Sequence, residues 1–352
     1  MELLYKPNAE ASLDRFESWW KCENEAPLVD IRVPQPYDPP RKSYPSQRGA
    51  WLDFGGRLER FEEDCRHTDF VADSFPAFNP NLGPDLLSTL WGTQIQFAPD
   101  TSWVSPIARS CEEVLDLRAD FGSPFWQEAL RFTRMSLERG QGKWLTCFHD
   151  LHPNADIPSA LIGPETLCLE FADDLNAARK AIESVTPDCV RAYETLHGMI
   201  AETGQPSLTW LPAPHRGRMY VPQCDFSAMI STDMFVEAVL PSIRAELEAT
   251  DRGIYHLDGP DALRHLDVLL EIPEIHGIQW VYGAGNGPAL RWAHVYQRIQ
   301  KAGKCMQILA ETPEDALALH RILGPEGVLY AMGFGLPKEE TLDLLEALGS
   351  PA

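Results

Sequence analysis

The sequence predicts an α/β protein: a closed parallel (β/α)8 TIM barrel in a single domain with an N-terminal helical extension. Short apolar stretches alternate with amphipathic ones, without a break from residue 253 to 348, and counting gives eight strands separated by helices. The 352 residues, 44% of them hydrophobic, are enough for the core of such a barrel. An open doubly wound sheet has the same local pattern and is the alternative fold.

The N-terminal extension is predicted to cover residues 1–26, with an amphipathic helix over 8–22, and the barrel to cover 27–352. Each predicted strand is a short apolar run ended by turn residues or by a helix signal, and these runs are 27–33, 69–75, 143–148, 219–226, 253–258, 277–281, 304–309 and 327–332. Helices are predicted over 58–66, 125–140, 164–171, 173–184, 187–203, 231–249, 261–270, 288–301, 313–323 and 338–348. An extra short strand is predicted at 207–212, and loops at 34–45, 76–84 and 91–106.

The charge of the chain restricts its partners. Thirty basic and 52 acidic residues give a net charge of −22, which repels phosphate backbones and argues against nucleic acid or an anionic membrane as the main partner. A small-molecule substrate and a basic protein partner are compatible with this charge. The sequence shows neither a signal peptide nor an apolar run of about 20 residues, so we expect a cytoplasmic protein. Its eight scattered cysteines form no Cys-x-x-Cys motif and predict neither a zinc knuckle nor a disulfide framework.

The first candidate for chemistry is the strand at 253–258, which ends with His256 and Asp258 just before a Gly-Pro helix start. Side chains two residues apart in a strand point to the same face. An imidazole and a carboxylate placed in this way suit a metal site or an acid/base pair. The structural alternative is a hydrogen-bonded histidine beside a helix-capping aspartate.

The second candidate is the polar group His149, Asp150 and His152, which follows the strand at 143–148. Its alternative interpretation is turn formation. In a barrel the site lies at the carboxyl ends of the strands. We therefore expect the following residues to converge: Arg32, Asn79, His149, Asp225, His256, Asp258 and Trp280, with Tyr282 next to them. Aromatic side chains near strand ends suit an aryl ether or a quaternary ammonium group, although each can equally pack a loop against the rim; they are Phe75, Phe78, Trp91, Trp103, Trp210, Trp280 and Tyr282.

The order of these segments resembles the uroporphyrinogen decarboxylase superfamily, which also contains methyltransferases that move methyl groups between corrinoid proteins and thiols. The resemblance runs from the first strand to the end of the chain. It is clearest in the segments 224–227, 235–241, 255–259, 277–280 and 332–336. The resemblance implies the barrel fold, a small-molecule site at the strand ends and a corrinoid carried by a partner protein.

Departures from the family pattern indicate which activity to expect. Arg32 matches the arginine at the end of the first strand of the decarboxylases, but the second arginine of their motif has no counterpart. The aspartate that ends their second strand is missing, and Gly333-Phe334-Gly335 replaces their final Gly-His-Gly. These differences argue against porphyrinogen decarboxylation.

The zinc-dependent methyltransferases of the superfamily use His-x-Cys at the end of strand five and a cysteine at the end of strand eight. His256 matches the histidine, whereas Asp258 stands at the first cysteine and Phe334 near the last. A metal held by His256 and Asp258 needs further ligands from His149, Asp225 or Cys305. Such a nitrogen and oxygen set suits zinc or another divalent metal with open positions.

Three functions remain open on this basis. The first is a methyltransferase or demethylase of a small methylated substrate that exchanges methyl groups with a corrinoid protein, with His256, Asp258, His149 and Asp225 as catalytic residues and Arg32, Asn79, Trp280 and Tyr282 as substrate-binding residues. The second is a decarboxylase or other lyase with Arg32 as carboxylate clamp and His149 or Asp225 as acid/base. The third is a non-catalytic barrel that binds a ligand or a corrinoid protein. The sequence leaves oligomerisation open.

Overall fold

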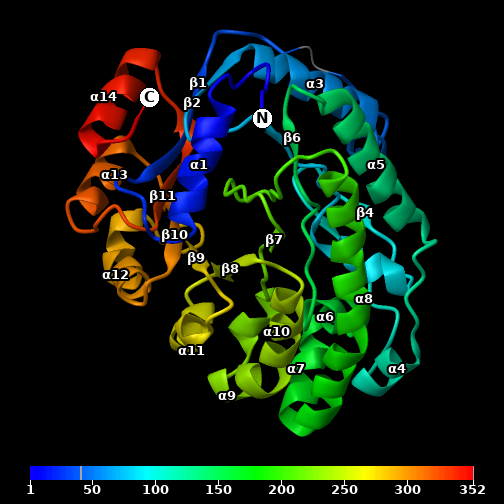
Figure 1. The fold of residues 1–352 in the computed structure, drawn as a ribbon. Coiled ribbons are helices and arrows are strands. Elements are labelled where there is room, and N and C mark those ends of the chain that lie inside the picture. The colour runs from blue at the N-terminus through cyan, green and yellow to red at the C-terminus, as the bar shows by residue number, and fades with distance from the viewer. Residues whose placement is uncertain (40–41, 352) are drawn as a thin grey trace.

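The computed structural model describes residues 1–39 and 42–351 as a mixed α/β fold around a mostly parallel sheet (Figure 1). Seven strands lie in the order β2-β1-β11-β10-β9-β8-β7, and β2 alone runs antiparallel to its neighbour β1. The strands of this sheet are β1 (Leu28–Pro34), β2 (Thr68–Ala72), β7 (Met219–Tyr220), β8 (Arg252–Asp258), β9 (Gly277–Val281), β10 (Cys305–Ala310) and β11 (Val328–Gly335). Two short pairs lie apart from it: β3 (Ala77–Phe78) with β6 (Leu145–Thr146), and β4 (Gln96–Phe97) with β5 (Ser102–Trp103).

Helices connect and cover these strands. Those of the N-terminal half are α1 (Ala9–Trp19), α2 (Gln47–Trp51), α3 (Phe54–Arg66), α4 (Cys111–Asp116), α5 (Pro124–Gly140), α6 (Asp156–Ile162), α7 (Pro164–Asp173) and α8 (Leu175–Ala201). Those of the C-terminal half are α9 (Thr232–Met234), α10 (Leu240–Glu248), α11 (Leu266–Glu271), α12 (Ala293–Lys301), α13 (Pro313–His320) and α14 (Lys338–Leu348). In Figure 1, α12, α13 and α14 lie outside β10 and β11, and the long α8 lies at the opposite side of the molecule.

Short irregular helices complete the connections. The 3-10 helices are η1 (Pro84–Trp91), η2 (Asp225–Met229), η4 (Ala262–His265) and η5 (Ala289–Trp292), and η3 (Phe235–Val239) is a π-helix. Helix starts follow the usual side-chain chemistry, since Ser231 Oγ accepts the backbone N–H of Met234 and Thr312 Oγ1 accepts that of Asp315.

The closed eight-stranded barrel is not confirmed, although each predicted strand position corresponds to a strand of the structure. Within the described residues, the β3–β6 pair is not part of the seven-stranded sheet. The stretch predicted as the second parallel strand is β2, which is antiparallel to β1. Proline explains why β3 and β7 are short, because proline has no N–H to donate to a neighbouring strand. Pro76 and Pro80 flank β3, and Pro222 follows β7.

Two other element predictions are corrected. The two helices predicted over 173–184 and 187–203 form one helix, α8, which contains Pro187. The extra strand predicted at 207–212 is reduced to an isolated bridge between Ser207 and His215, with Pro206 and Pro212 on either side of the stretch.

The N-terminal segment packs against the end of β2. Lys6 Nζ donates to the carbonyl oxygen of Ala72, and Ser12 Oγ donates to the same oxygen over 3.0 Å. Arg15 Nε donates to Asp73 Oδ1 over 2.6 Å, and the Asp73 side chain is fully buried. Removing one partner of an ion pair that is shielded from water is costly, because the other charge is left unpaired. The pair of Arg15 and Asp73 therefore fixes α1 to the sheet. The division at residue 26 stays a prediction.

Across residues 1–39 and 42–351, no helix combines the length and the apolar character that a membrane crossing requires.

Candidate functional site

Strand β8 presents His256 and Asp258 on one face. Leu257 between them is buried, whereas His256 is half-buried and Asp258 is exposed, as the alternation of a strand requires. Gly259 then turns the chain with a φ of +82°, a conformation that glycine adopts without strain. Asp225, the first residue of η2, joins this pair, and one ligand atom from each of the three side chains lies within 4.8 Å of the others.

A chain of amides fixes the imidazole of His256. The Nδ1–H of His256 donates to Gln279 Oε1, and Gln279 Nε2 in turn donates to Gln307 Oε1. Gln279 lies opposite His256 in the pairing of β8 with β9, so the contact follows from the register of the sheet. This arrangement protonates Nδ1 and leaves the lone pair of Nε2 available to a metal or a proton.

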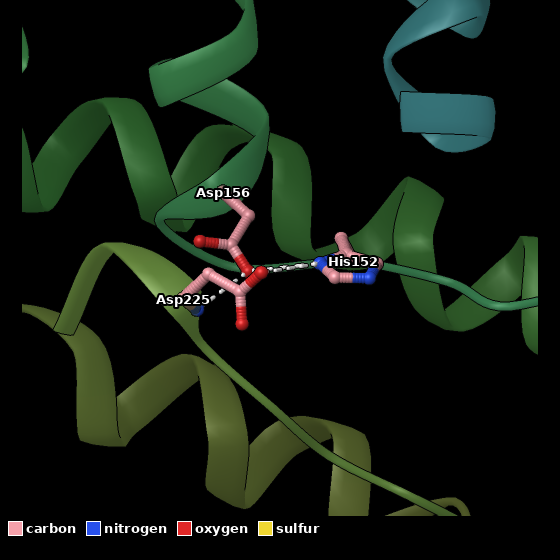
Figure 2. A group of neighbouring side chains, drawn as sticks. All are labelled: His152, Asp156 and Asp225. Atoms are coloured by element: carbon pink, nitrogen blue, oxygen red, sulfur yellow. Dashed lines mark hydrogen bonds and ion pairs between the residues drawn. The ribbon is translucent and has the colours of Figure 1, made fainter. Parts of the chain in front are cut away.

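A second group of polar side chains shares Asp225 with the first. Figure 2 shows His152, from the loop after β6, with one edge of its ring directed at both Asp156 at the start of α6 and Asp225 of η2. His152 Nδ1 lies 3.5 Å from Asp156 Oδ2 and 3.7 Å from Asp225 Oδ2. On the other side of the ring, His152 Nε2 donates to Asp150 Oδ2 over 3.1 Å. His152 is therefore surrounded by three carboxylates.

Two of these carboxylates are held by further hydrogen bonds. Asp156 accepts the backbone N–H groups of Asp225 and Phe226 over 3.0 and 2.9 Å, and so attaches η2 to the start of α6. Gln223 Nε2 donates to Asp150 Oδ1 over 2.7 Å. Asp225 has no such hydrogen bond to its carboxylate among the described residues.

The pKa values reflect this crowding. Burial by itself lowers the pKa of His152, but Asp150 and Asp156 together outweigh burial and hold it well above its usual value. Partial desolvation by neighbouring groups, followed by repulsion from Asp156, raises the pKa of Asp225 to about 6, although 54% of its side chain is exposed. The region thus gathers four aspartates, Asp150, Asp156, Asp225 and Asp258, around the imidazoles of His152 and His256.

A cavity of about 460 Å³ opens next to His256 at the carboxyl ends of β1, β10 and β11. Arg32 lines it, as do Gln279 and Gln307 of the amide chain, and Trp210, whose ring centroid lies 6.0 Å from that of His256. Asp30 also lines the cavity, and burial raises the pKa of its carboxyl. The cavity thus offers a guanidinium, two amides and an aromatic face to a small molecule.

The structure does not bring all predicted site residues together. His149 is fully buried and faces α5, where its Nε2 lies 3.0 Å from Thr133 Oγ1, and burial lowers its pKa to about 4. Trp280 is fully buried against Trp292 on the other face of β9 from Gln279. These two side chains are directed away from the cavity, so the structure gives no geometric basis for the predicted catalytic role of His149 or the substrate contact of Trp280.

The two remaining predicted contacts also lie apart from the cavity lining. The hydroxyl of Tyr282 donates to the carbonyl oxygen of Leu309 over 2.9 Å, on the same face of the chain as Trp280. Asn79, just after β3, has a buried Oδ1 without a hydrogen bond among the described residues. Arg32 is the one predicted substrate-binding residue that lines the cavity.

Several residues of the site were not predicted as such. Gln279 and Gln307 lie in the middle of apolar strands, where a glutamine that alternates with apolar neighbours signals a polar inner face. His152 was named in the second candidate group, but Asp156 had no signal beyond its position at a helix start. Sequence spacing could not show that Asp156 binds the backbone of η2.

The donor set fits a divalent metal. His256 and the carboxylates of Asp225 and Asp258 supply one imidazole nitrogen and two carboxylates, ligands that suit a catalytic site with open positions. Cys305 does not belong to this group, because it begins β10 and its thiol donates to the carbonyl oxygen of Trp19. Of the three further ligands considered from the sequence, Asp225 alone lies beside His256 and Asp258.

Comparison with known proteins gives a likeness of fold. No family model and no curated protein sequence matches the chain. Among solved structures, a methyltransferase from Methanosarcina mazei superposes with a TM-score of 0.60 at 11% sequence identity, covering 96% of this chain and 98% of that one. Since the sequence identity is so low, the likeness shows that the two chains share a fold over almost their whole length.

Proposed function

We propose that the protein is a methyltransferase or demethylase of a small methylated substrate, that it belongs to the uroporphyrinogen decarboxylase superfamily, and that it exchanges the methyl group with a corrinoid on a separate protein. The likeness of fold to a methyltransferase supports this proposal. The order of the segments that resemble the superfamily supports it independently.

The observation that carries the proposal is the group Asp225, His256 and Asp258, which the contact of His256 with Gln279 connects to the cavity lining. Its two carboxylates attract a cation, and the amide chain from Gln307 through Gln279 engages His256 at Nδ1, so that Nε2 is the ring nitrogen left for a metal. Without a cation between them, the carboxylates of Asp225 and Asp258 repel each other. A site that retains this arrangement is suited to a divalent metal.

These residues have different roles in the proposed methyl transfer. When bound, a divalent metal supplies a Lewis acid that polarises the heteroatom from which the methyl group departs. Asp225, His256 and Asp258 would hold that ion, while Gln279 orients the imidazole. Arg32 and the face of Trp210 bind and orient the body of the substrate in the cavity, so that its methylated end lies toward His256.

The methyl transfer requires no oxidant from this protein. The bond between the methyl carbon and its heteroatom breaks, its electron pair stays on the heteroatom, and the methyl group passes to the nucleophilic cobalt of the corrinoid protein. Without a metal, His256 can move the proton of the demethylated group through the same Nε2.

The test combines metal analysis with turnover. We expect a divalent metal in near-stoichiometric amount in the purified protein, and its loss in His256→Ala and Asp258→Asn. Asp258→Asn keeps the volume and removes the charge, so turnover should fall by at least about 10²-fold while the protein melts at nearly the same temperature. Turnover is measured with the corrinoid protein and a panel of methyl ethers and methylated amines.

The matched control is Asp261→Asn, an exposed aspartate that follows the same strand but lies outside the metal-ligand group. It should retain both metal and turnover. The proposal is wrong if Asp258→Asn and His256→Ala lower stability but leave activity per folded molecule unchanged, because the pair would then be structural.

Assays on the same purified protein distinguish the two alternative functions, a carboxy-lyase and a binding protein. A carboxy-lyase would release carbon dioxide from a carboxylated substrate held by Arg32, without a corrinoid protein. Uroporphyrinogen should not be decarboxylated, since the strand-two aspartate and the strand-eight histidine are missing. A retained ligand without turnover on any substrate would instead indicate a binding protein.

A further inference from the structure

Two thiols from distant parts of the chain lie side by side at the start of β10. Cys22 follows α1, Cys305 begins β10, and their sulfur atoms are 3.6 Å apart although 283 positions separate them. All eight cysteines are free thiols. We propose that Cys22 and Cys305 are a redox-active pair that a hydroperoxide oxidises to a disulfide, fastening the N-terminal segment to the sheet.

The backbone around the pair is shaped to hold both sulfur atoms. Cys22 has a φ of +55°, a left-handed conformation that a cysteine rarely adopts and that neighbouring contacts must maintain. A Cβ atom at Gly327 would lie 2.8 Å from Cys22 Sγ and 3.2 Å from Cys305 Cα. Glycine therefore leaves room for the thiol between the two segments. The Cys305 thiol also donates to the carbonyl oxygen of Trp19 over 2.8 Å.

The two thiols differ in access and in acidity. Cys22 is half-buried, so a small oxidant can reach it, whereas Cys305 is buried. The contact with the Cys305 thiol lowers the pKa of Cys22, and burial raises the pKa of Cys305. Because the thiolate is the nucleophile, Cys22 attacks first and Cys305 resolves the product.

The reaction balances in two steps. The Cys22 thiol loses its proton, its sulfur attacks one oxygen of the hydroperoxide, and the O–O bond breaks to give a sulfenic acid. The departing oxygen takes up the proton and leaves as water or an alcohol. The Cys305 sulfur then loses its proton and attacks the Cys22 sulfur, so that the S–S bond forms, the S–O bond breaks and water leaves. Both thiols are oxidised, and the peroxide is reduced by two electrons.

The cross-link acts on a segment that supports the cavity. Residues Lys6, Ser12 and Arg15 bind the end of β2 through Ala72 and Asp73. Strand β2 in turn pairs with β1, which carries Arg32. A disulfide at Cys22 therefore holds in place the segment that backs this edge of the site, and closing so long a loop strongly restricts the unfolded chain.

The experiment treats the reduced protein with one equivalent of hydrogen peroxide under non-denaturing conditions. Peptide mapping without reductant should give the linked peptides of Cys22 and Cys305, and the count of free thiols should fall from eight to six. The melting temperature should rise by on the order of 5–10 °C and return to its starting value with dithiothreitol.

Three variants make the test decisive. Cys22→Ser should keep Cys305 reduced, and Cys305→Ala should leave a Cys22 sulfenic acid that dimedone traps. Cys168→Ser, which removes a half-buried thiol elsewhere, should behave as the unaltered protein. Eight thiols remaining after oxidation, or a cross-link between other cysteines, would overturn the proposal.

Discussion

One half-buried carboxyl, that of Glu246, is not needed by the proposed chemistry. Glu246 of α10 accepts a hydrogen bond from Asn154 Nδ2 over 3.1 Å and another from Ser242 Oγ over 3.3 Å through Oε1. Its Oε2 is out of reach of solvent and has no partner among the described residues. Burial raises the pKa of Glu246 to about 8, so the folded protein keeps this carboxyl protonated at neutral pH.

Glu246 should therefore make stability depend on pH. The unfolded chain loses this proton near its ordinary pKa of 4.5, whereas the folded chain keeps it up to about 8. The free energy of unfolding thus falls as pH rises through this window, and the loss is complete above pH 8. Glu246→Gln removes the titration. We expect it to be more stable than the unaltered protein at pH 8, by on the order of 3 kcal/mol, with the difference vanishing toward pH 4.5.

Urea denaturation at pH 5 and pH 8 measures this effect. The exposed Glu248, two residues further along α10, provides the control, because Glu248→Gln should leave the difference between the two pH values unchanged. A Glu246→Gln protein with the same pH dependence as the unaltered one would show that this carboxyl ionises freely in the folded state.

At the scale of elements, the position of η2 depends on Asp156 of α6. Both carboxylate oxygens of Asp156 are used by backbone N–H groups of η2, and Asp225 is the first residue of that helix. A short 3-10 helix has few hydrogen bonds of its own, so this contact sets where the Asp225 carboxylate lies. The contact joins two parts of the site that are far apart in the sequence.

Asp156→Ala should damage both stability and the metal-ligand group. Two backbone N–H groups lose their acceptor, which costs about 1–3 kcal/mol in the free energy of unfolding. Metal content should fall as well, because Asp225 is no longer held near His256 and Asp258. Asp156→Asn keeps one acceptor oxygen, so its stability and metal content should lie between those of the unaltered protein and of Asp156→Ala. Urea denaturation and metal analysis give the measurements, with the exposed Asp173→Ala of α7 as control. Unchanged metal content in Asp156→Ala would contradict the positioning role.

At the scale of the whole molecule, the proposed function requires a corrinoid carried by a partner protein. The sequence has no Asp-x-His-x-x-Gly motif, and its nearest approach, Asp150-Leu151-His152, continues to Ala155 in place of glycine. In the structure His152 is engaged with Asp150 and Asp156 and is not free to reach a cobalt ion. The net charge of −22 favours a partner whose docking face is basic.

The isolated chain should therefore not bind free cobalamin tightly, and turnover should require a second protein that carries the corrinoid. Equilibrium dialysis of cobalamin against the purified chain tests the first point. Adding candidate corrinoid proteins to the methyl-transfer assay at low and high salt tests the second, with weaker association expected at high salt. Turnover with free cobalamin alone would refute this arrangement.

The sequence by itself located eight of the strands, although it missed the short strands β3, β4 and β5 and misplaced the ends of β2 and β7. The alternation of side chains is a local property of an extended chain, so the shared face of His256 and Asp258 could be predicted from the sequence. The expectation that strand ends meet at one edge of a parallel sheet also placed Asp225 near them. The first inference needs only the regular geometry of the long strand β8, whereas Asp225 lies in η2, beyond the two residues of β7.

Tertiary structure alone determined the features that side-chain alternation and the meeting of strand ends do not predict. His149 lies beyond the two residues of β6, where alternation no longer applies, and packing against α5 sets its direction. The antiparallel course of β2 and the separation of the β3–β6 pair depend on long-range pairing that proline limits. The contacts of Gln279 with His256, and of Asp156 with η2, join residues distant in sequence. Such contacts follow from the register of neighbouring elements, and no local pattern encodes them.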